Sequence, residues 1–216
     1  MAEQEGVIKY HLEHTTKPLP PTIDFSDLNS WRSIMIKLEM IGQNPGRYEG
    51  LGFGNISQRL NNNDSSFLVS GTQTGHLDPL GKQDWCIVQS ADPEKNTIIS
   101  EGPSKPSSEA LTHACVYIER PEVQAIIHGH CPVIWRNTRQ LNLSHTDYHI
   151  AYGTPEMALA VTRLIRAKKF STGGVFSMLG HEDGVIAFAA TMQQAAEYLI
   201  LTLEMALKIE HKRIVL

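Results

Sequence analysis

The apolar positions of this chain follow two spacings, and the alternation between them predicts its helices and strands. Apolar residues three and four positions apart share one face of a helix. This spacing predicts helices over residues 26–41, 109–120, 154–165 and 191–207. Short β-branched or apolar runs predict strands. These cover residues 56–60, 67–70, 84–89, 96–101, 123–128, 175–179 and 185–189.

Most of the predicted strands are joined in pairs by short polar turns, which is typical of β-hairpins. The turns are residues 61–64, the Asp92-Pro93 pair and residues 180–184. We therefore expect a sheet built mainly from hairpins, with helices packed around it.

Residues at the helix ends support these boundaries. Ser107 or Ser108 can cap the second helix, and Pro121 stops it after Arg120. Thr154 caps the third helix, whose end is favoured by Lys168-Lys169. Residues 191–194 form a capping box for the last one. The first helix should bury an apolar stripe and stop at Gly42, and its stripe consists of Trp31, Ile34, Met35, Leu38 and Ile41.

The length of 216 residues suits one domain with a sizeable core. Residues 1–21 are polar and end in Pro18-Leu19-Pro20-Pro21, which predicts an extended arm that could lie on a neighbouring molecule, with no assignable chemistry. We therefore expect a single domain over residues 22–216, with no internal repeat.

Composition narrows the class of protein further. Apolar residues make up 41% and charged residues 19%, and the net charge is −4 without a basic block, which argues against nucleic-acid binding. The three cysteines are odd in number and unpatterned, and neither a signal peptide nor a transmembrane run is evident. These features predict a cytoplasmic protein without a membrane partner.

Cys131 follows His130, but adjacent strand residues face opposite ways, so we expect it to pack in the core.

The most informative stretch is residues 103–130. From Glu109 the helix climbs roughly 15 Å, and the strand that follows descends roughly 16 Å to His128. Antiparallel packing would bring the carboxylate of Glu109 beside that imidazole. His130 lies two positions further along and therefore on the same strand face. Imidazole and carboxylate both bind zinc, so this arrangement favours a metal site over two ordinary strand histidines.

A third ligand has to come from elsewhere in the chain. His181 is the best candidate because it sits in the turn of a hairpin, although an exposed turn histidine is the simpler interpretation of its spacing alone. The competitors have no equally defined backbone context. They are His76, His113, His145 and His149.

Two loops are rich in glycine and hydroxyl side chains: G-L-G-F-G-N-I-S at residues 50–57 and S-G-T-Q-T-G at residues 70–75. Each alone is typical of a tight turn. Together, however, their backbone N–H groups and side-chain donors could hold a phosphate.

In chain order, the motifs are G-x-G-N-I-S, S-G-T-x-T-G, P-S-S-E, H-G-H, Y-G-T-P-E and L-G-H-x-x-G. This series resembles the class II aldolase/adducin family from about Trp31 to Leu207. The family includes fuculose-phosphate aldolase, ribulose-phosphate 4-epimerase and methylthioribulose-phosphate dehydratase. The resemblance implies an α/β fold, a three-layer αβα sandwich around a mixed, mostly antiparallel central sheet. It also implies a homotetramer with active sites between subunits.

The resemblance also implies roles for individual residues. Glu109 matches the catalytic acid/base, which can also ligate the metal, and His128, His130 and His181 match the zinc ligands. The residues matching those that hold the substrate phosphate are Gly54, Asn55, Thr74, Gly75, Ser107 and Ser108.

This set suits carbanion chemistry on a small phosphorylated sugar. Zinc, or another divalent ion, would stabilise an enediolate while a carboxylate moves the proton. We therefore expect an aldolase-type lyase of carbohydrate metabolism, with a dehydratase or epimerase of the same family as alternatives. A metal-free, adducin-like scaffold is a competing class, disfavoured because all four metal-site residues are present. A hydrolase using H-x-H would need a parallel barrel, which the hairpins contradict.

Three features depart from the aldolases and leave the substrate open. The segment between His130 and Gly153 is short, and Tyr148 or Tyr152 could supply a proton-transferring tyrosine. The turn H-E-D-G is two residues longer than usual. Gln73 stands where the aldolases commonly have proline.

Overall fold

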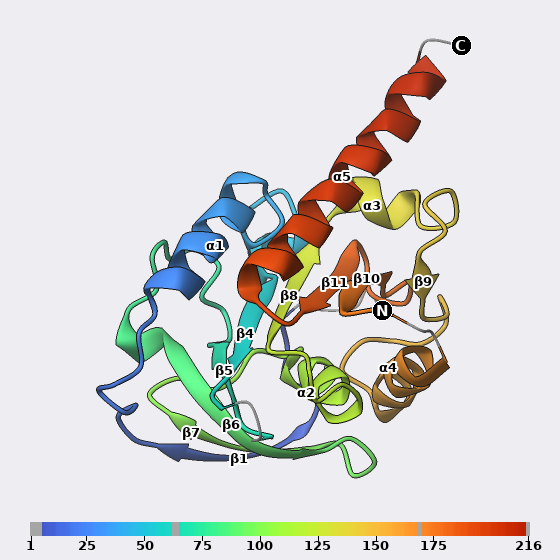
Figure 1. Ribbon diagram of the computed structural model, residues 1–216. Helices are drawn as coiled ribbons and strands as arrows, with labels where there is room; N and C mark the ends of the chain where they lie inside the picture. Colours follow the sequence, from blue (N-terminus) through green and yellow to red (C-terminus); the bar gives the residue numbers. More distant parts are fainter. Residues whose placement is uncertain (1–5, 62–64, 168–169, 215–216) are drawn as a thin grey trace.

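A nine-stranded mixed sheet forms the centre of the computed structural model, which describes residues 6–61, 65–167 and 170–214 (Figure 1). The strand order is β1-β7-β6-β5-β4-β8-β11-β10-β9. Its strands are β1 (His11–Thr16), β4 (Asn55–Arg59), β5 (Phe67–Ser70), β6 (Trp85–Asp92), β7 (Thr97–Gly102), β8 (Ala125–His130), β9 (Ser144–His145), β10 (Gly173–Ser177) and β11 (Gly184–Ala189). The short strands β2 (Gly42–Gln43) and β3 (Gly52–Phe53) pair separately.

The pairing is antiparallel except at the two edges of the sheet. The three expected hairpins form as β4–β5, β6–β7 and β10–β11. Strand β8 lies between β4 and β11, antiparallel to both, and it begins and ends two residues later than predicted. The parallel pairs are β1–β7 and β9–β10. Of the turn expected at residues 61–64, residues 62–64 lie outside the described part.

Helices cover both faces of the sheet, which confirms the predicted αβα sandwich (Figure 1). The helices are α1 (Ser26–Lys37), α2 (Ala110–Glu119), α3 (Pro132–Arg136), α4 (Pro155–Ala167) and α5 (Met192–Ile214). One hydrophobic core lies between the sheet and α2 and α4. A second lies between the opposite face and α1, α3 and α5. No helix in the described ranges has the length and apolar character needed to cross a membrane.

Strand β8 lies in the enclosed centre of the sheet, with all six residues buried. Alternate side chains point to opposite faces. Ala125 and Ile127 therefore join the core under α5, whereas Ile126 joins the core under α2. By the same alternation His128 and His130 face the α2 side. Cys131 packs in the α5-side core, as expected.

Helix α1 differs from the prediction at its buried face. It ends at Lys37 rather than continuing to residue 41, and its buried residues include Leu28 and Arg32 as well as Met35. Ile34 and Leu38, which we expected in the core, are each more than a third exposed. The predicted stripe is confirmed at Met35 and Ile41 and wrong at Ile34 and Leu38, because the buried face instead includes Arg32, a cation that apolar spacing cannot reveal.

The N-terminal segment pairs with the sheet of the same chain. Residues 11–16 of the predicted arm form β1, which adds to the edge of the sheet in register with β7, His11 opposite Thr97. The region between His130 and Gly153, for which no helix or strand was predicted, contains α3 and β9. The two lysines expected to close α4, Lys168 and Lys169, lie outside the described residues.

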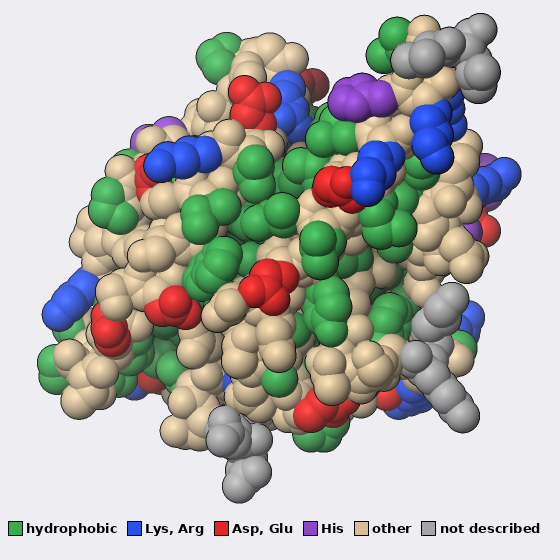
Figure 2. Space-filling model, turned by 45° about the horizontal axis from the view of Figure 1, so that its top comes forward, with side chains coloured by type: hydrophobic (Ala, Val, Ile, Leu, Met, Phe, Trp, Pro, Cys, Tyr) green, Lys and Arg blue, Asp and Glu red, His purple; other side chains and the backbone are tan. Residues whose placement is uncertain are grey.

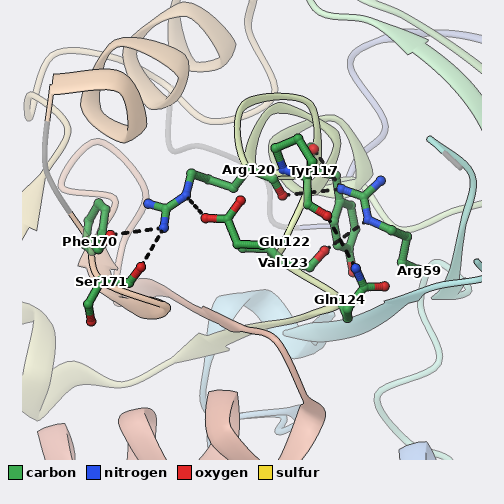
Figure 3. Close-up of polar contacts among 9 residues, drawn as sticks. Arg59, Tyr117, Arg120, Glu122, Val123, Gln124, Phe170 and Ser171 are labelled. Carbon is green, nitrogen blue, oxygen red and sulfur yellow. Dashed lines mark hydrogen bonds and ion pairs between the residues drawn. The ribbon is translucent and has the colours of Figure 1, made fainter. Parts of the chain in front are cut away.

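Two arginines fix the corner where α2 leads into β8 (Figure 3). Arg59 donates from Nε to the carbonyl of Val123 at 3.0 Å and from NH2 to the carbonyl of Tyr117 at 2.7 Å. Arg120 donates to the carbonyls of Phe170 and Ser171 on the other side of the corner. Charged donors therefore satisfy the carbonyls at the helix end, where backbone acceptors lack helical partners.

Hydrophobic side chains gather on the outer surface over α1 and α5 (Figure 2). Leu201, Met205 and Ile214 of α5 are 59%, 52% and 81% exposed. The C-terminal half of α5 extends beyond the sheet (Figure 1).

A polar cluster inside the α2-side core ties that helix to the sheet. Ser57 Oγ lies 2.7 Å from His113 Nδ1 and 2.9 Å from the hydroxyl of Tyr117. All three residues are buried. Burial lowers the pKa of His113 to about 3, so its imidazole stays neutral in the folded protein.

This depressed pKa predicts a loss of stability in acid. Below the unfolded-state pKa of about 6.5, the unfolded chain protonates His113 while the folded chain does not. The stabilisation is complete above that pH and falls as the pH drops. Between pH 7 and pH 5, His113 should account for about 2 kcal/mol of the loss. Urea unfolding of wild type and His113→Gln at both pH values measures this. Equal losses in the two proteins would contradict it.

Candidate functional site

Three buried histidines meet on the α2 side of the sheet. His128 and His130 project from β8, and His181 comes from the turn between β10 and β11. Each side chain offers one ring nitrogen, and these three nitrogens all lie within 4.8 Å of one another. Each residue is at most 1% exposed. The structure thus brings together the two strand histidines and the turn histidine singled out in the sequence.

The nitrogen positions suit a common metal ion. The Nε2 atoms of His128 and His130 are 3.2 Å apart. Two nitrogens bound to one tetrahedral zinc at about 2.0–2.1 Å would lie roughly 3.3 Å apart. His128 Nδ1 lies 3.2 Å from the carbonyl oxygen of Val185, which can only accept a hydrogen bond. Its Nδ1 is therefore the protonated nitrogen, and Nε2 keeps the lone pair that a metal requires.

Electrostatics favours the neutral, ligand form of His130. Burial, followed by His181, His128 and Arg47, holds the pKa of His130 well below its usual range. Its imidazole is therefore neutral at pH 7, and neutral imidazole is the form that coordinates metals.

Glu109 lies beside this group but outside it. Its Oε1 is 3.9 Å from His181 Nδ1. Its other oxygen, Oε2, accepts a 2.6 Å hydrogen bond from the hydroxyl of Thr112, a contact that the sequence analysis missed. Thr112 is three residues along from Glu109, the spacing at which helical neighbours meet, and that spacing was the available signal.

The start of α2 differs from the serine cap that we predicted. Glu109 itself occupies the N-cap position, and no side-chain hydrogen bond caps this described helix. Instead the carbonyl of Ser107 accepts a bond from Ala110 N–H, and Ser107 Oγ lies 3.5 Å from Glu109 N. The serines come too early in the chain to cap the helix, and they line a cavity instead.

That cavity unites the donor-rich loops. The residues that line it include all six positions matched to phosphate binding: Gly54, Asn55, Thr74, Gly75, Ser107 and Ser108. Strand pairing sets Asn55 of β4 opposite His128 of the adjacent strand β8. The cavity and the histidine group are therefore next to each other on the sheet. Asn55 Oδ1 has no hydrogen-bond partner within the described residues.

A buried cation supports one of these loops from behind. Arg32 of α1 donates from NH2 to the carbonyl of Thr74 at 2.8 Å and from NH1 to that of Leu77 at 2.5 Å. Its burial lowers the pKa to about 10, so the guanidinium remains charged at pH 7. Sequence reasoning missed Arg32 because it sits on a helix 42 residues away from Thr74.

The competing histidines and Tyr148 lie apart from the group of three, as far as the described residues go, whereas Tyr152 contacts it. His76, His145 and His149 are exposed, and His113 is bonded to Ser57. Tyr148 is 51% exposed and packs on Trp135. Tyr152 is fully buried and stacks on His181, with ring centroids 4.4 Å apart. Of the two tyrosines considered, only Tyr152 contacts this group.

Comparisons with known proteins agree with the fold and the motifs. A family model, Class II Aldolase and Adducin N-terminal domain, matches residues 47–211. The methylthioribulose-1-phosphate dehydratase of Pseudomonas savastanoi is 34% identical over 99 residues, 44% of this chain and 45% of that protein. The protein of the same name from Methylococcus capsulatus is 35% identical over 79 residues, 37% of this chain and 34% of that protein. The matched part spans less than half the length of these relatives.

Solved structures resemble most of the chain. An L-fuculose-1-phosphate aldolase from Thermus thermophilus superposes with a TM-score of 0.63, 17% identity and coverage of 88% of this chain and 94% of that one. A sugar-phosphate aldolase from Thermotoga maritima gives 0.63, 15% identity and coverage of 86% and 94%. At such identities, the likeness shows the fold alone.

Proposed function

Since the chain belongs to the class II aldolase and adducin N-terminal domain family, we propose that it is a divalent-metal-dependent lyase acting on a small phosphorylated sugar. The observation that carries this proposal is the buried group of three imidazoles with a carboxylate 3.9 Å from one of them. Three imidazoles with a carboxylate beside them are a donor set that divalent ions take readily, which favours this proposal over a metal-free, adducin-like scaffold.

In this proposal His128, His130 and His181 hold zinc or another divalent ion, with Glu109 as an additional ligand at rest. Such an ion, when bound, acts as a Lewis acid for negative charge on a substrate oxygen.

Glu109 is the proposed acid/base. Thr112 holds one carboxylate oxygen, while the other faces His181, so the group has a fixed orientation. A carboxylate held in this way can take a proton from the carbon beside a carbonyl and return it.

The donor-rich cavity is the proposed phosphate site. Binding the phosphate one strand away from the histidines would orient the reacting carbon. Arg32 adds a buried positive charge behind the loop at Thr74.

Two reactions fit the same residues. Aldol cleavage is the first, and dehydration of a phosphorylated ketose is the second. The dehydratases with 34–35% identity favour the second over part of the chain. Both reactions need a proton moved at the carbon beside a ketone.

We also propose that the active protein is a cytoplasmic homotetramer. The exposed apolar side chains on α5 supply surface for contacts between copies.

Metal content tests the ligand assignment. The freshly purified chain should hold about one divalent ion, as a three-histidine site requires. His128→Ala, His130→Ala and His181→Ala should each lose most of it, because two imidazoles bind far more weakly than three. His149→Ala, which alters an exposed histidine, is the matched control. Elemental analysis gives the content. A full complement of metal in His181→Ala would remove that residue from the site.

Glu109→Gln separates the acid/base from the ligands. The variant should keep its fold and most of its metal, because three imidazoles remain. Proton exchange beside the carbonyl of a phosphorylated ketose should slow by roughly two to four orders of magnitude. NMR in heavy water follows that exchange without knowledge of the product.

Glu119→Gln, at the other end of α2, controls for the loss of a carboxylate on the same helix. If Glu109→Gln exchanges as fast as wild type, the base is another residue, and Tyr152 becomes the first to test.

A further inference from the structure

The loop before β3 contacts the histidine group through an aromatic ring on His130. Tyr48 and Glu49 adopt left-handed backbone conformations, with φ of 48° and 58°. Such conformations are unfavourable for residues with side chains and persist where surrounding contacts enforce them. Here they place the ring of Tyr48 edge-on to His130, with centroids 4.7 Å apart.

The hydroxyl of Tyr48 joins two charged side chains. It donates to Asp183 Oδ2 at 2.7 Å and accepts from Arg47 NH2 at 2.8 Å. The same arginine nitrogen lies 3.3 Å from the carbonyl of His130. The hydroxyl uses both its donor and its acceptor capacity, which fixes its direction.

Asp183 belongs to the turn that carries His181. This turn is the H-E-D-G segment of residues 181–184. The Asp183 carbonyl accepts a 2.8 Å bond from Cys131 N–H, directly after His130. Through Asp183, Tyr48 therefore connects the strand that carries two of the histidines to the turn that carries the third.

We propose that Tyr48 is a positioning residue that clamps the His181 turn against His130 and thereby sets the affinity of the three-histidine site for its ion. This inference rests on the proposed function. Partners beyond the ligands orient metal-binding rings, and their loss typically weakens binding roughly ten- to a hundredfold.

The experiment measures zinc affinity by competition with a chelating dye. Tyr48→Phe keeps the ring against His130 and removes only the hydroxyl, so its zinc Kd should rise roughly ten- to a hundredfold. Asp183→Asn should raise it as well. The double variant should be no weaker than the worse single one, because both changes break one connection. Tyr198→Phe, on α5 and outside this group, should leave the Kd unchanged.

The possible results separate the clamp from the metal site. Wild-type affinity in both Tyr48→Phe and Asp183→Asn would overturn the clamp while leaving the metal site intact. Equal losses of thermal stability without a change in Kd would reduce Tyr48 to a purely structural role. Failure of the wild type itself to bind zinc would overturn the proposed function and the clamp together.

A separate observation concerns the N-terminal segment Gly6–Tyr10, which we call the strap. The carbonyl of Gly6 accepts bonds from Thr72 Oγ1 and Gln73 Nε2, both at 3.4 Å. Gly6 thus lines the cavity proposed for phosphate. Its oxygen occupies the position of an acceptor at the very loop where an anion would bind. The remaining space, about 10 Å³, is only what one water needs.

The strap is anchored at its other end. Tyr10 is 5% exposed, and its hydroxyl donates to the carbonyl of Ser107 at 2.8 Å. Strand β1 follows directly. Lys9 lies between Gly6 and Tyr10, with its Nζ 3.2 Å from the carbonyl of Tyr152. Ile8 packs against the α2-side core, and the carbonyl of Lys9 accepts a bond from Asn96 Nδ2 at 3.2 Å, so Gly6 and Val7 are the part of the strap that can leave the loop.

We infer that the strap competes with the substrate phosphate, so that Gly6 must leave the loop at residues 72–73 before the phosphate binds. This inference also rests on the proposed function, and it makes the strap a gate over the cavity. Gln73 is central to it, because its Oε1 accepts from Gly52 N–H at 2.9 Å while its Nε2 holds Gly6.

A single substitution in the full chain tests the gate. Gly6 has φ of +68°, which strains any residue with a Cβ, and an added Cβ would also meet the end of the Gln73 side chain at 2.0 Å and the carbonyl oxygen of Gly52 at 3.2 Å. Gly6→Val should therefore unseat the strap and tighten inorganic phosphate binding about tenfold. Val7→Ala, at the exposed neighbour, should bind like wild type. Calorimetry gives the Kd, and hydrogen exchange should show phosphate deprotecting residues 6 and 7 in wild type.

Unchanged or weaker phosphate binding in Gly6→Val would overturn the gate, because the strap would then be neutral or part of the pocket. If neither protein binds phosphate, the proposed phosphate cavity fails, and the gate with it.

Discussion

Two imidazoles face each other across one glycine on a strand that is covered on both sides, and the surrounding structure has to satisfy them. Buried polar groups need partners, because water is no longer available to them. His128 obtains one from the carbonyl of Val185 on the next strand, and His181 approaches from the turn that precedes that strand. The position of β8 between β4 and β11 is therefore a condition of the site.

The two faces of the sheet differ in polarity. The face under α1, α3 and α5 is lined mainly by apolar side chains. The face under α2 carries a polar row, in which Asn55 lies opposite His128 and Ser57 holds His113. Segregating polar groups to one face lets the other bury apolar area without interruption, which is the main driving force for folding.

Much of the site was predictable because its spacing is local. Residues i and i+2 of a strand share a face. The lengths of helix and strand predicted Glu109 beside His128, and in the structure its Oε1 lies 3.9 Å from His181 Nδ1. The three hairpins likewise follow from short segments with clear turn and strand signals, and the donor-rich loops stand out in the same way. Even there, the expected serine cap was wrong, because the helix begins at Ala110 with Glu109 as its N-cap.

The contacts that sequence reasoning missed join residues far apart in the chain. Arg32 acts on Thr74, Tyr48 on Asp183 and Tyr10 on Ser107, at separations of 42, 135 and 97 residues. Local periodicity also misassigned Ile34 and Leu38 at the buried face of α1, since a buried arginine breaks the apolar pattern.

The sequence by itself determined the long helices and the hairpin strands, though not β1, α3 or β9, and that His128 and His130 share a face, because those properties depend on neighbours within a few residues. Only the tertiary structure decided which loops close over the site, including the N-terminal strap and the loop at Tyr48. Such closures depend on chain paths and on side chains meeting across the fold, and no local spacing encodes them.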